Sequence, residues 1–414
     1  MLGILLSRIV RRGSLTILYP KGKQETFGSG EPYVAIRLHD RRAAWELLLH
    51  PDLKFGELYT DGRLTLEQGT LFELFDMLIS GLARVQPSGL HRMVRAFRHL
   101  TRSLAQYNPA ARSKDHVAHH YDLSGRLYDL FLGQDKQYSC AYFSAPGETL
   151  EEAQIGKKRH IAAKLHLNKP GLKVLDIGCG WGGMALNLAQ DSGAKVLGVT
   201  LSEEQIAIAR DRAAKAQLDE TCKFELVDYR ALGGRYDRIV SVGMFEHVGA
   251  PYYAAFFSKV RELLADDGVM LLHTIGRSEG PGSTNAWIAK YIFPGGYAPA
   301  LSEVTAAIEK SGLIITDVEV LRLHYAETLR EWRNRFEHNR AQIAAVYDER
   351  FCRMWEFYLV GSEMAFRYDG EVVFQVQLTK QAGVLPLTRD YMVDDERTMR
   401  FAGTEQMPRP LRVV

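Results

Sequence analysis

A glycine-rich segment at residues 174–183 has the composition of a nucleotide-binding loop. It reads VLDIGCGWGG, with Asp176 two positions before the first glycine. Glycines allow a backbone to approach a ligand closely, and a helix that begins after them exposes its N-terminal N–H groups. Dinucleotide sites are typically GxGxxG, whereas the spacing here is GxGxGG. The candidate ligand-binding residues of this segment are Asp176, Gly178, Gly180, Trp181 and Gly182.

The strand that follows distinguishes between two classes of ligand. An NAD site requires an acidic residue at the end of this strand, where it binds the ribose hydroxyls. The segment ends in Val-Thr-Leu-Ser, with Thr200 at that position. This disfavours NAD and favours S-adenosylmethionine. Residues placed to bind its ribose and adenine are Thr200, Ser202, Gln205, Asp228 and Tyr229.

Three other segments carry candidate reacting residues. Glu246 comes after a predicted strand at 238–242, and His273 ends a predicted strand at 269–273. Open α/β sheets bind ligands at the carboxyl ends of their strands. Cys140 lies in the aromatic segment QYSCAYF. Each residue also has an ordinary structural interpretation. Glu246 could cap a helix, His273 could be a core histidine with its hydrogen bonds satisfied, and Cys140 could be an inert buried thiol.

The hydrophobic pattern predicts the elements that position these residues. Strands and helices alternate, which is typical of a doubly wound, mostly parallel sheet. The predicted strands are 173–177, 195–200, 223–227, 238–242, 269–273 and 372–379, and the predicted helices are 182–190, 202–216, 251–264 and several within 325–367.

The N-terminal part has a different pattern. Short β-like runs at 15–19 and 33–38, with helical segments at 43–49 and 70–79, predict a small α+β domain. Residues 84–114 carry seven basic residues and no acidic one. A basic amphipathic helix can bind an anionic membrane surface, and a solvated linker is the alternative.

Composition excludes several classes of protein. The 414 residues carry 52 Lys+Arg and 50 Asp+Glu, which argues against a globally basic nucleic-acid-binding protein. The four cysteines lie far apart without a CxxC pair, which disfavours a metal site and indicates a reducing, cytoplasmic compartment. The apolar segment 2–10 is too short and too charged to span a bilayer and predicts a buried or membrane-surface helix. The predicted domains are 1–100, a basic linker at 101–118, 119–395 and a tail at 396–414.

Eight segments together resemble the cyclopropane-fatty-acyl-phospholipid synthases and the related mycolic acid cyclopropane synthases. The resemblance covers about residues 115–380 and extends more weakly over the first 100. The segments are HHYDLS (119–124), QYSCAYF (137–143), VLDIGCGWGG (174–183), GVTLSEEQ (198–205), VDYR (227–230), RIVSVGMFEHVG (238–249), LLHTIG (271–276) and KYIFPGG (290–296).

The resemblance implies a Rossmann-like class I methyltransferase domain. It implies methyl transfer from S-adenosylmethionine to a cis double bond of a phospholipid acyl chain, and loss of a proton from the resulting carbocation to a bound bicarbonate. The positions that match the bicarbonate site are Cys140, Glu246, His273, the backbone of Ile275 and Tyr325. The positions that match the methyl-donor site are Tyr138, Ser139, Gly178, Gly180, Thr200, Gln205, Asp228 and Tyr229.

One departure and two alternatives accompany the resemblance. Many relatives carry a cysteine where this chain has Ser362, followed by Glu363, which could reach the pocket or face solvent. A sister methyltransferase would give a methylene- or methyl-branched acyl chain from the same cation. A catalytically inactive lipid- or donor-binding protein is disfavoured, because binding alone would not require Cys140, Glu246 and His273 together. The relatives also suggest a homodimer that associates transiently with the inner face of the cell membrane.

Overall fold

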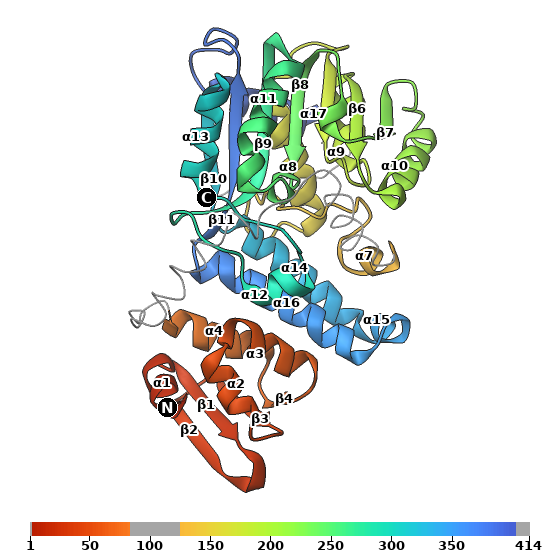
Figure 1. Ribbon diagram of the computed structural model, residues 1–414. Coiled ribbons are helices and arrows are strands. Elements are labelled where there is room, and N and C mark those ends of the chain that lie inside the picture. Colours follow the sequence, from red (N-terminus) through yellow and green to blue (C-terminus); the bar gives the residue numbers. More distant parts are fainter. Residues whose placement is uncertain (1, 83–124, 403–414) are drawn as a thin grey trace, which may run out of the picture.

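The computed structural model describes residues 2–82 and 125–402, which form two units stacked end to end. The smaller N-terminal unit and the larger α/β unit are joined by a layer of long helices (Figure 1). Within the described residues, none of the helices has both the length and the apolar character needed to cross a bilayer.

The N-terminal unit is a four-stranded sheet with helices packed on it. The strand order is β2-β1-β3-β4, and only the β1–β3 pair is parallel. Alternate residues of β1 and β3 are buried, including Leu15, Ile17 and Val34, so one face of the sheet forms the core. The elements are α1 (Leu2–Ile9), β1 (Gly13–Leu18), β2 (Gln24–Ser29), β3 (Tyr33–Leu38), α2 (Ala43–Leu49), α3 (Pro51–Thr60), β4 (Leu64–Gln68) and α4 (Leu71–Leu82).

The larger unit contains a seven-stranded sheet in the order β10-β11-β9-β8-β5-β6-β7. Strands β5 to β9 pair in parallel, whereas β11 runs antiparallel to both β9 and β10. The strands are β5 (Lys173–Ile177), β6 (Lys195–Thr200), β7 (Cys222–Leu226), β8 (Tyr236–Val242), β9 (Leu264–Arg277), β10 (Ile314–Leu321) and β11 (Glu371–Thr379).

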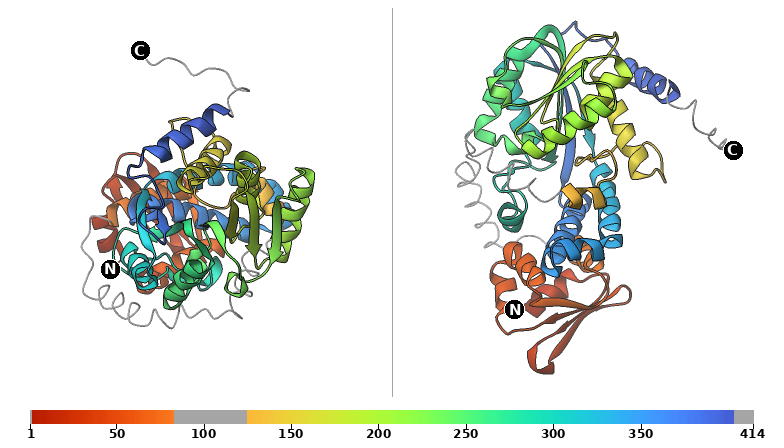
Figure 2. Two further views of the ribbon diagram at one scale, coloured as in Figure 1. Left: turned by 90° about the horizontal axis from the view of Figure 1, so that it is seen from above. Right: turned by 90° about the vertical axis from the view of Figure 1, so that its right-hand side faces the viewer.

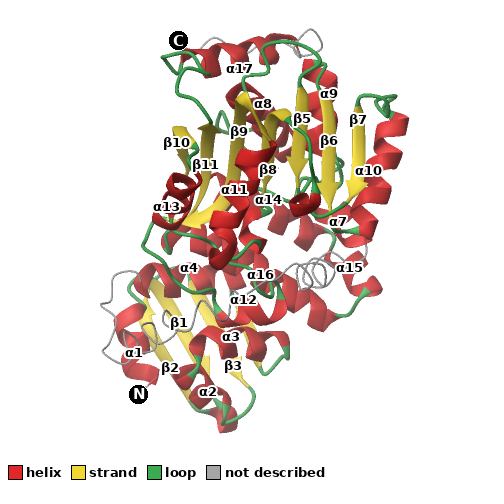
Figure 3. Cartoon of the chain, turned by 45° about the horizontal axis from the view of Figure 1, so that its top comes forward, coloured by secondary structure: helices red, strands yellow, loops and turns green. Residues whose placement is uncertain are grey.

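Helices cover both faces of this sheet (Figure 3). One apolar cluster joins the sheet to α11 and α13, and another joins it to α8, α9 and α10. The predicted doubly wound, mostly parallel Rossmann-like sheet is therefore confirmed. The helices are α7 (Gly125–Phe131), α8 (Leu150–Lys164), α9 (Gly183–Ser192), α10 (Glu203–Lys215), α11 (Tyr253–Leu263), α12 (Ala286–Tyr291), α13 (Leu301–Ser311) and α17 (Asp390–Ala402).

Three helices between β10 and β11 connect the two units. They are α14 (His324–His338), α15 (Arg340–Val346) and α16 (Glu349–Tyr368). Helix α16 packs against α14 on one side and against α3 and α4 on the other (Figure 2). The Phe357 ring contacts Phe75 of the N-terminal unit at a centroid distance of 5.1 Å. One apolar cluster therefore continues from the N-terminal unit through these helices into the larger unit.

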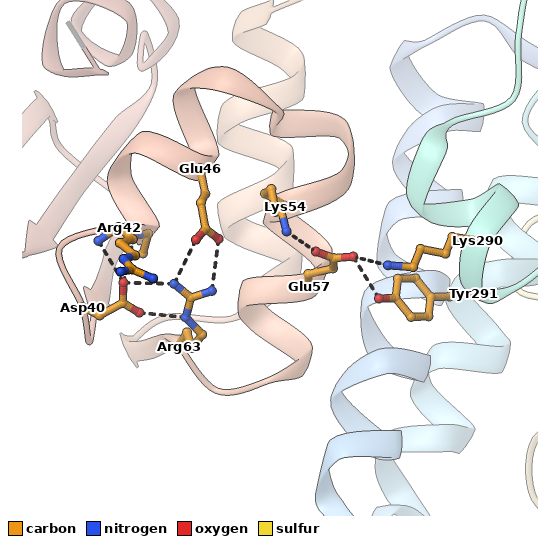
Figure 4. Close-up of polar contacts among 9 residues, drawn as sticks. Asp40, Arg42, Glu46, Lys54, Glu57, Arg63, Lys290 and Tyr291 are labelled. Atoms are coloured by element: carbon orange, nitrogen blue, oxygen red, sulfur yellow. Dashed lines mark hydrogen bonds and ion pairs between the residues drawn. The ribbon is translucent and has the colours of Figure 1, made fainter.

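Polar contacts reinforce this junction (Figure 4). The Glu57 carboxylate of α3 accepts from Lys290 Nζ at 2.7 Å and from Tyr291 Oη at 2.9 Å, both on α12. Inside the N-terminal unit, Arg63 binds Asp40 and Glu46. The segment KYIFPGG, recognised in the sequence, thus begins at a contact between the two units.

Several sequence predictions can be compared with these bounds. The predicted strands 173–177 and 195–200 match β5 and β6. Strand β9 begins five residues before the predicted strand 269–273, because it includes Asp266 and Asp267, which the apolar pattern left out. The predicted boundary at 395/396 falls inside α17. The basic stretch 84–114, the linker 101–118 and the segment 119–124 lie outside the described residues.

Candidate active site

The glycine loop connects β5 to α9 and needs its glycines for conformation and space. Gly178 has φ +84° and Gly180 has φ +54°, in the left-handed region that other residues rarely adopt. A Cβ on Gly178 would lie 2.7 Å from Cβ of Met244. The N–H groups of Gly178 and Cys179 both donate to the carbonyl of Val199, which ties the loop to β6.

A pocket lies over this loop at the carboxyl ends of β5, β6 and β8. Every residue predicted from sequence to bind the cofactor lines this pocket, except Gly182 and Ser202. The predicted residues that line it are Tyr138, Ser139, Asp176, Gly178, Gly180, Trp181, Thr200, Gln205, Asp228 and Tyr229. Gly182 instead packs against Phe224 at the start of α9. The Ser202 side chain caps α10 by accepting from the Gln205 N–H at 3.3 Å. Both residues therefore have structural roles beside the pocket.

The far wall of the pocket carries an acidic group that is fixed in place. The Asp228 carboxylate accepts from the backbone N–H and from Nε of Arg230, both at 2.9 Å. Burial alone would raise the pKa of Asp228, but the bonds from Arg230 lower it overall. The Tyr229 ring forms the adjoining wall and packs edge-on against Phe256 at 5.4 Å. Arg230 also lines the pocket and was not predicted, although it completes the VDYR segment.

Thr200 and Gln205 form a neutral polar pair at the end of β6. Thr200 Oγ1 donates to Gln205 Oε1 at 2.8 Å, and both side chains are buried. The pair offers hydrogen bonds without a charge where a dinucleotide site would have an acid.

Glu246 lies immediately behind the pocket on η3 (Phe245–His247), which follows β8. Its Oε1 accepts from the Ile275 N–H at 2.6 Å, and its Oε2 has no hydrogen-bond partner among the described residues. Burial raises the pKa of Glu246 to about 7. The resemblance implied that the backbone of Ile275 binds bicarbonate. In the structure, the Ile275 N–H instead donates to Glu246.

His273 lies on β9, two residues before Ile275. Its Nδ1 is 3.1 Å from Nε2 of Gln375, and its Nε2 has no partner within the described part of the chain. Burial holds the pKa of His273 well below its usual value, and the nearby charges of Lys157 and Lys164 lower it further. The imidazole is therefore neutral at physiological pH.

A hydrogen bond between the neighbours of Cys140 and Tyr325 ties the Cys140 segment to α14. The Ala141 N–H donates to Thr328 Oγ1 at 3.0 Å, and Tyr325 lies one turn before Thr328. Burial raises the pKa of Cys140, so its sulfur remains a thiol, which donates to the Ala141 carbonyl at 3.3 Å. The Tyr325 ring contacts Trp332, at 5.8 Å between centroids.

The predicted catalytic residues do not line the cofactor pocket; they lie next to residues that do. Met244 lies two residues before Glu246, His247 follows Glu246 directly, and Ser139 precedes Cys140. All three of these neighbours line the pocket. The Tyr138 ring lies 5.2 Å from Trp332, which Tyr325 also contacts. Cys140, Tyr325, Tyr138 and Ile275 belong to the same apolar cluster. This cluster borders the pocket through Tyr138 and Trp181, which line it.

Lys157 is a residue of this region that sequence reasoning missed. Its ammonium group is fully buried and donates to Gln137 Oε1 at 2.6 Å and to Ser139 Oγ at 2.8 Å. Burial lowers the pKa of Lys157 to about 7 and raises that of nearby Asp176 to about 7. Lys157 stands in the run KKRH of α8, which resembles a solvated face, so the sequence gave no signal of its burial.

The segment that departs from the family pattern is structural. Glu363 is fully buried and accepts from Arg333 at 3.1 Å and from Arg367 at 2.8 Å. It neither faces solvent nor lines the pocket. Ser362 beside it is partly buried on α16. The buried carboxylate therefore serves to join α14 and α16.

Comparisons with known proteins identify the family. The family model described as mycolic acid cyclopropane synthetase matches residues 109–376. A "Probable fatty acid methyltransferase" of Pseudomonas putida is 42% identical over 288 residues, 67% of this chain and 73% of that protein. The "Cyclopropane-fatty-acyl-phospholipid synthase" of Escherichia coli K12 is 37% identical over 334 residues, 81% of this chain and 85% of that protein.

A solved structure shows the same relationship. The mycolic acid cyclopropane synthase CmaA1, complexed with SAH and CTAB, superposes with a TM-score of 0.61 at 35% identity, covering 66% of this chain and 99% of its own. The glycine loop, the pocket over it and the sequence matches together place this chain in the mycolic acid cyclopropane synthetase family of S-adenosylmethionine-dependent methyltransferases.

Proposed function

We propose that this protein uses S-adenosylmethionine to convert the cis double bond of an unsaturated acyl chain in a membrane phospholipid into a cyclopropane ring. The name of the Escherichia coli relative supports this substrate and product. The observation that carries the proposal is a pair of buried polar atoms that have no partner among residues 2–82 and 125–402, Glu246 Oε2 and His273 Nε2, next to residues that line the methyl-donor pocket. A buried polar atom without a partner is costly unless a ligand satisfies it.

The pocket residues fit the methyl donor. When bound, S-adenosylmethionine supplies an electrophilic methyl group on a sulfonium centre. The part of the loop around Gly180 lies before the start of α9, where the helix dipole favours a carboxylate, while the N–H groups of Gly178 and Cys179 hold the loop to Val199. Asp228 accepts hydrogen bonds from donor groups of the nucleoside, and Thr200 with Gln205 contacts its ribose through neutral groups. The Tyr138 ring favours positive charge at its face.

Glu246 and His273 fit a small oxyanion such as bicarbonate. When bound, bicarbonate supplies a base for the proton that must leave as the ring closes. The neutral His273 donates one hydrogen bond from Nε2, and ionised Glu246 accepts one from the hydroxyl of the anion. Ile275 holds Glu246 in place, and Tyr325 donates from the opposite helix. Cys140 contributes a thiol and apolar packing, without a nucleophile that a carbocation would alkylate.

The aromatic wall contributes exclusion of water. An alkene is a weak nucleophile, so its reaction depends on alignment and on a dry site. Tyr138 contacts Phe131 at 6.2 Å and Trp332 at 5.2 Å, and Phe131 and Trp332 are fully buried. Water that entered this region would capture the cation and give an alcohol.

We also propose that the enzyme works at the inner face of the cell membrane, as a peripheral protein of the cytoplasm that forms a homodimer. The basic stretch 84–114 supports the membrane contact through its charge alone.

Incubation with vesicles of a monounsaturated phospholipid and methyl-labelled S-adenosylmethionine tests the reaction. We expect labelled acyl chains heavier by one CH₂ unit, with the upfield protons of a cyclopropane, and a rate that rises when bicarbonate is added to a depleted buffer. Unlabelled lipid would refute the activity. A rate that ignores bicarbonate would refute the role of the anion.

The second candidate is a sister reaction that leaves a methylene or methyl branch on the acyl chain. The name of the Pseudomonas putida relative favours it. A methylene product has the same mass as the cyclopropane but shows alkene protons, and a methyl-branched product carries two further hydrogens. The same incubation therefore separates the two candidates.

A further inference from the structure

A chain of buried polar groups runs from His273 to the C-terminal helix α17. His273 of β9 and Gln375 of β11 are paired directly across the two antiparallel strands. Gln375 also contacts Nζ of Lys164, on α8, at 2.7 Å. Lys164 forms an ion pair with Glu319 of β10. Glu319 contacts His160, and His160 contacts Glu396 of α17 at 3.0 Å. We call Glu319, His160 and Glu396 the outer members of the chain.

The chemistry of these groups fixes the direction of each hydrogen bond. A lysine ammonium donates only, so the Gln375 carbonyl oxygen must face Lys164. The Gln375 amide NH₂ then faces His273 and donates to Nδ1. Because the neutral imidazole carries one proton, that proton lies on Nε2. Because Lys164 can only donate, it identifies which end of the Gln375 amide is the oxygen.

The outer members of the chain keep Lys164 in this role. Glu319 is a carboxylate beside Lys164, and the His160 ring lies between two carboxylates, Glu319 and Glu396. Burial alone would lower the pKa of His160, but the bonds to these two groups raise it overall. The two ring nitrogens of His160 lie 2.7 Å from Glu319 and 3.0 Å from Glu396, so both donate when the ring is protonated. Burial lowers the pKa of Lys164, and the carboxylate of Glu319 beside it opposes that shift.

We propose that Gln375, held by Lys164, is a positioning residue that fixes His273 as the Nε2–H tautomer, so that His273 presents a hydrogen-bond donor to the reacting centre and cannot serve as its base. The atom that carries this donor is Nε2, for which the described part of the chain offers no partner. The inference rests on the proposed function and deepens it, because it assigns proton removal to a bound base instead of the histidine.

The tautomer of His273 is measurable by NMR on the full-length protein labelled with ¹⁵N-histidine, without methyl donor or bicarbonate. The His273 signals are assigned by their loss in His273→Ala. We expect a pyrrole-type nitrogen at Nε2 and a pyridine-type nitrogen at Nδ1. A protonated Nδ1 in the wild-type protein would overturn the inference.

Gln375→Glu replaces the donor that faces Nδ1 by an acceptor. We expect the Nδ1–H tautomer in this variant and a methyl-transfer rate that falls by at least about tenfold, with the KM for S-adenosylmethionine unchanged because Gln375 does not line the pocket. An unchanged tautomer, or an inverted tautomer with full activity, would contradict the proposal.

Gln377→Glu is the matched control. Gln377 lies two residues further along the same face of β11, is also buried, and donates to the Lys164 carbonyl and to Tyr391 Oη instead of His273. We expect this variant to keep the Nε2–H tautomer and its activity. If Gln375→Glu fails to fold, the wild-type spectrum still decides the question.

The two proposals can fail separately. The tautomer is observed without any ligand, whereas the role of the anion is judged from the bicarbonate dependence of the rate. An Nε2–H tautomer in an enzyme that ignores bicarbonate would support the positioning role of Gln375 and refute only the anion.

Discussion

Replacing Glu246 by glutamine should stabilise the protein and greatly reduce its activity. The carboxyl is buried, and among the residues that the structure describes only Oε1 has a partner, so its ionised form is destabilising in the native state. A shift of its pKa from 4.5 to about 7 corresponds to about 3 kcal/mol at about 1.4 kcal/mol per pH unit. Glutamine removes this charge and can still accept from the Ile275 N–H.

The sign of the pH dependence follows from proton linkage. Between pH 4.5 and 7 the native carboxyl keeps a proton that the unfolded chain has lost, so wild-type stability falls as pH rises through this window. Above pH 7 the full penalty is present. The free energy of unfolding of Glu246→Gln, relative to wild type, should therefore increase by up to about 3 kcal/mol between pH 4.5 and pH 8.

Urea denaturation of both proteins at several pH values measures this difference, because contributions from all other groups cancel. Activity, measured as label transferred to vesicle lipid, should fall by about 100-fold or more, since the anion loses its acceptor. A relative stability that stays constant between pH 4.5 and pH 8, or full activity in Glu246→Gln, would refute the reasoning.

Glu371→Gln provides the control for removal of a carboxylate that is partly buried, with a side chain 20% exposed. Burial raises the pKa of Glu371 to about 7 as well, and its partner is Arg277 at 3.3 Å. Glu371 does not line the pocket. This variant should show a pH-dependent change in stability of the same sign and retain methyl transfer.

Three further predictions concern the pocket, the thiol and the membrane. Gly178→Ala should weaken binding of S-adenosylmethionine in calorimetry by at least about tenfold, because its Cβ would clash with Met244 at a positive φ; unchanged affinity would contradict the proposed loop contact. Cys140→Ser should keep more than about a tenth of the activity, and wild-type Cys140 should react slowly with iodoacetamide, because its thiol is buried and protonated; rapid alkylation would contradict this. Binding to anionic vesicles in sedimentation assays should weaken as salt rises, and salt-independent binding would argue against a role for residues 84–114.

The sequence by itself determined the parts of the protein that depend on local pattern. Strands β5 and β6 match their predicted bounds because they are short apolar runs bounded by polar and glycine residues. The glycine loop between them was identifiable because its conformation requires glycine at fixed positions. Most of the predicted cofactor residues line one pocket, since the carboxyl ends of parallel strands share one edge of the sheet.

Only the tertiary structure decided which polar side chains are buried and what they contact. Lysine and glutamate usually lie on the surface, yet Lys157 and Glu363 are both fully buried. Gln375 reaches His273 across 102 residues and Lys164 across 211. Such contacts leave no periodic signal in a chain, because they depend on the packing of segments that are distant in sequence. The direction of the hydrogen bonds at His273, and with it the chemistry of that residue, is therefore a property of the folded sheet.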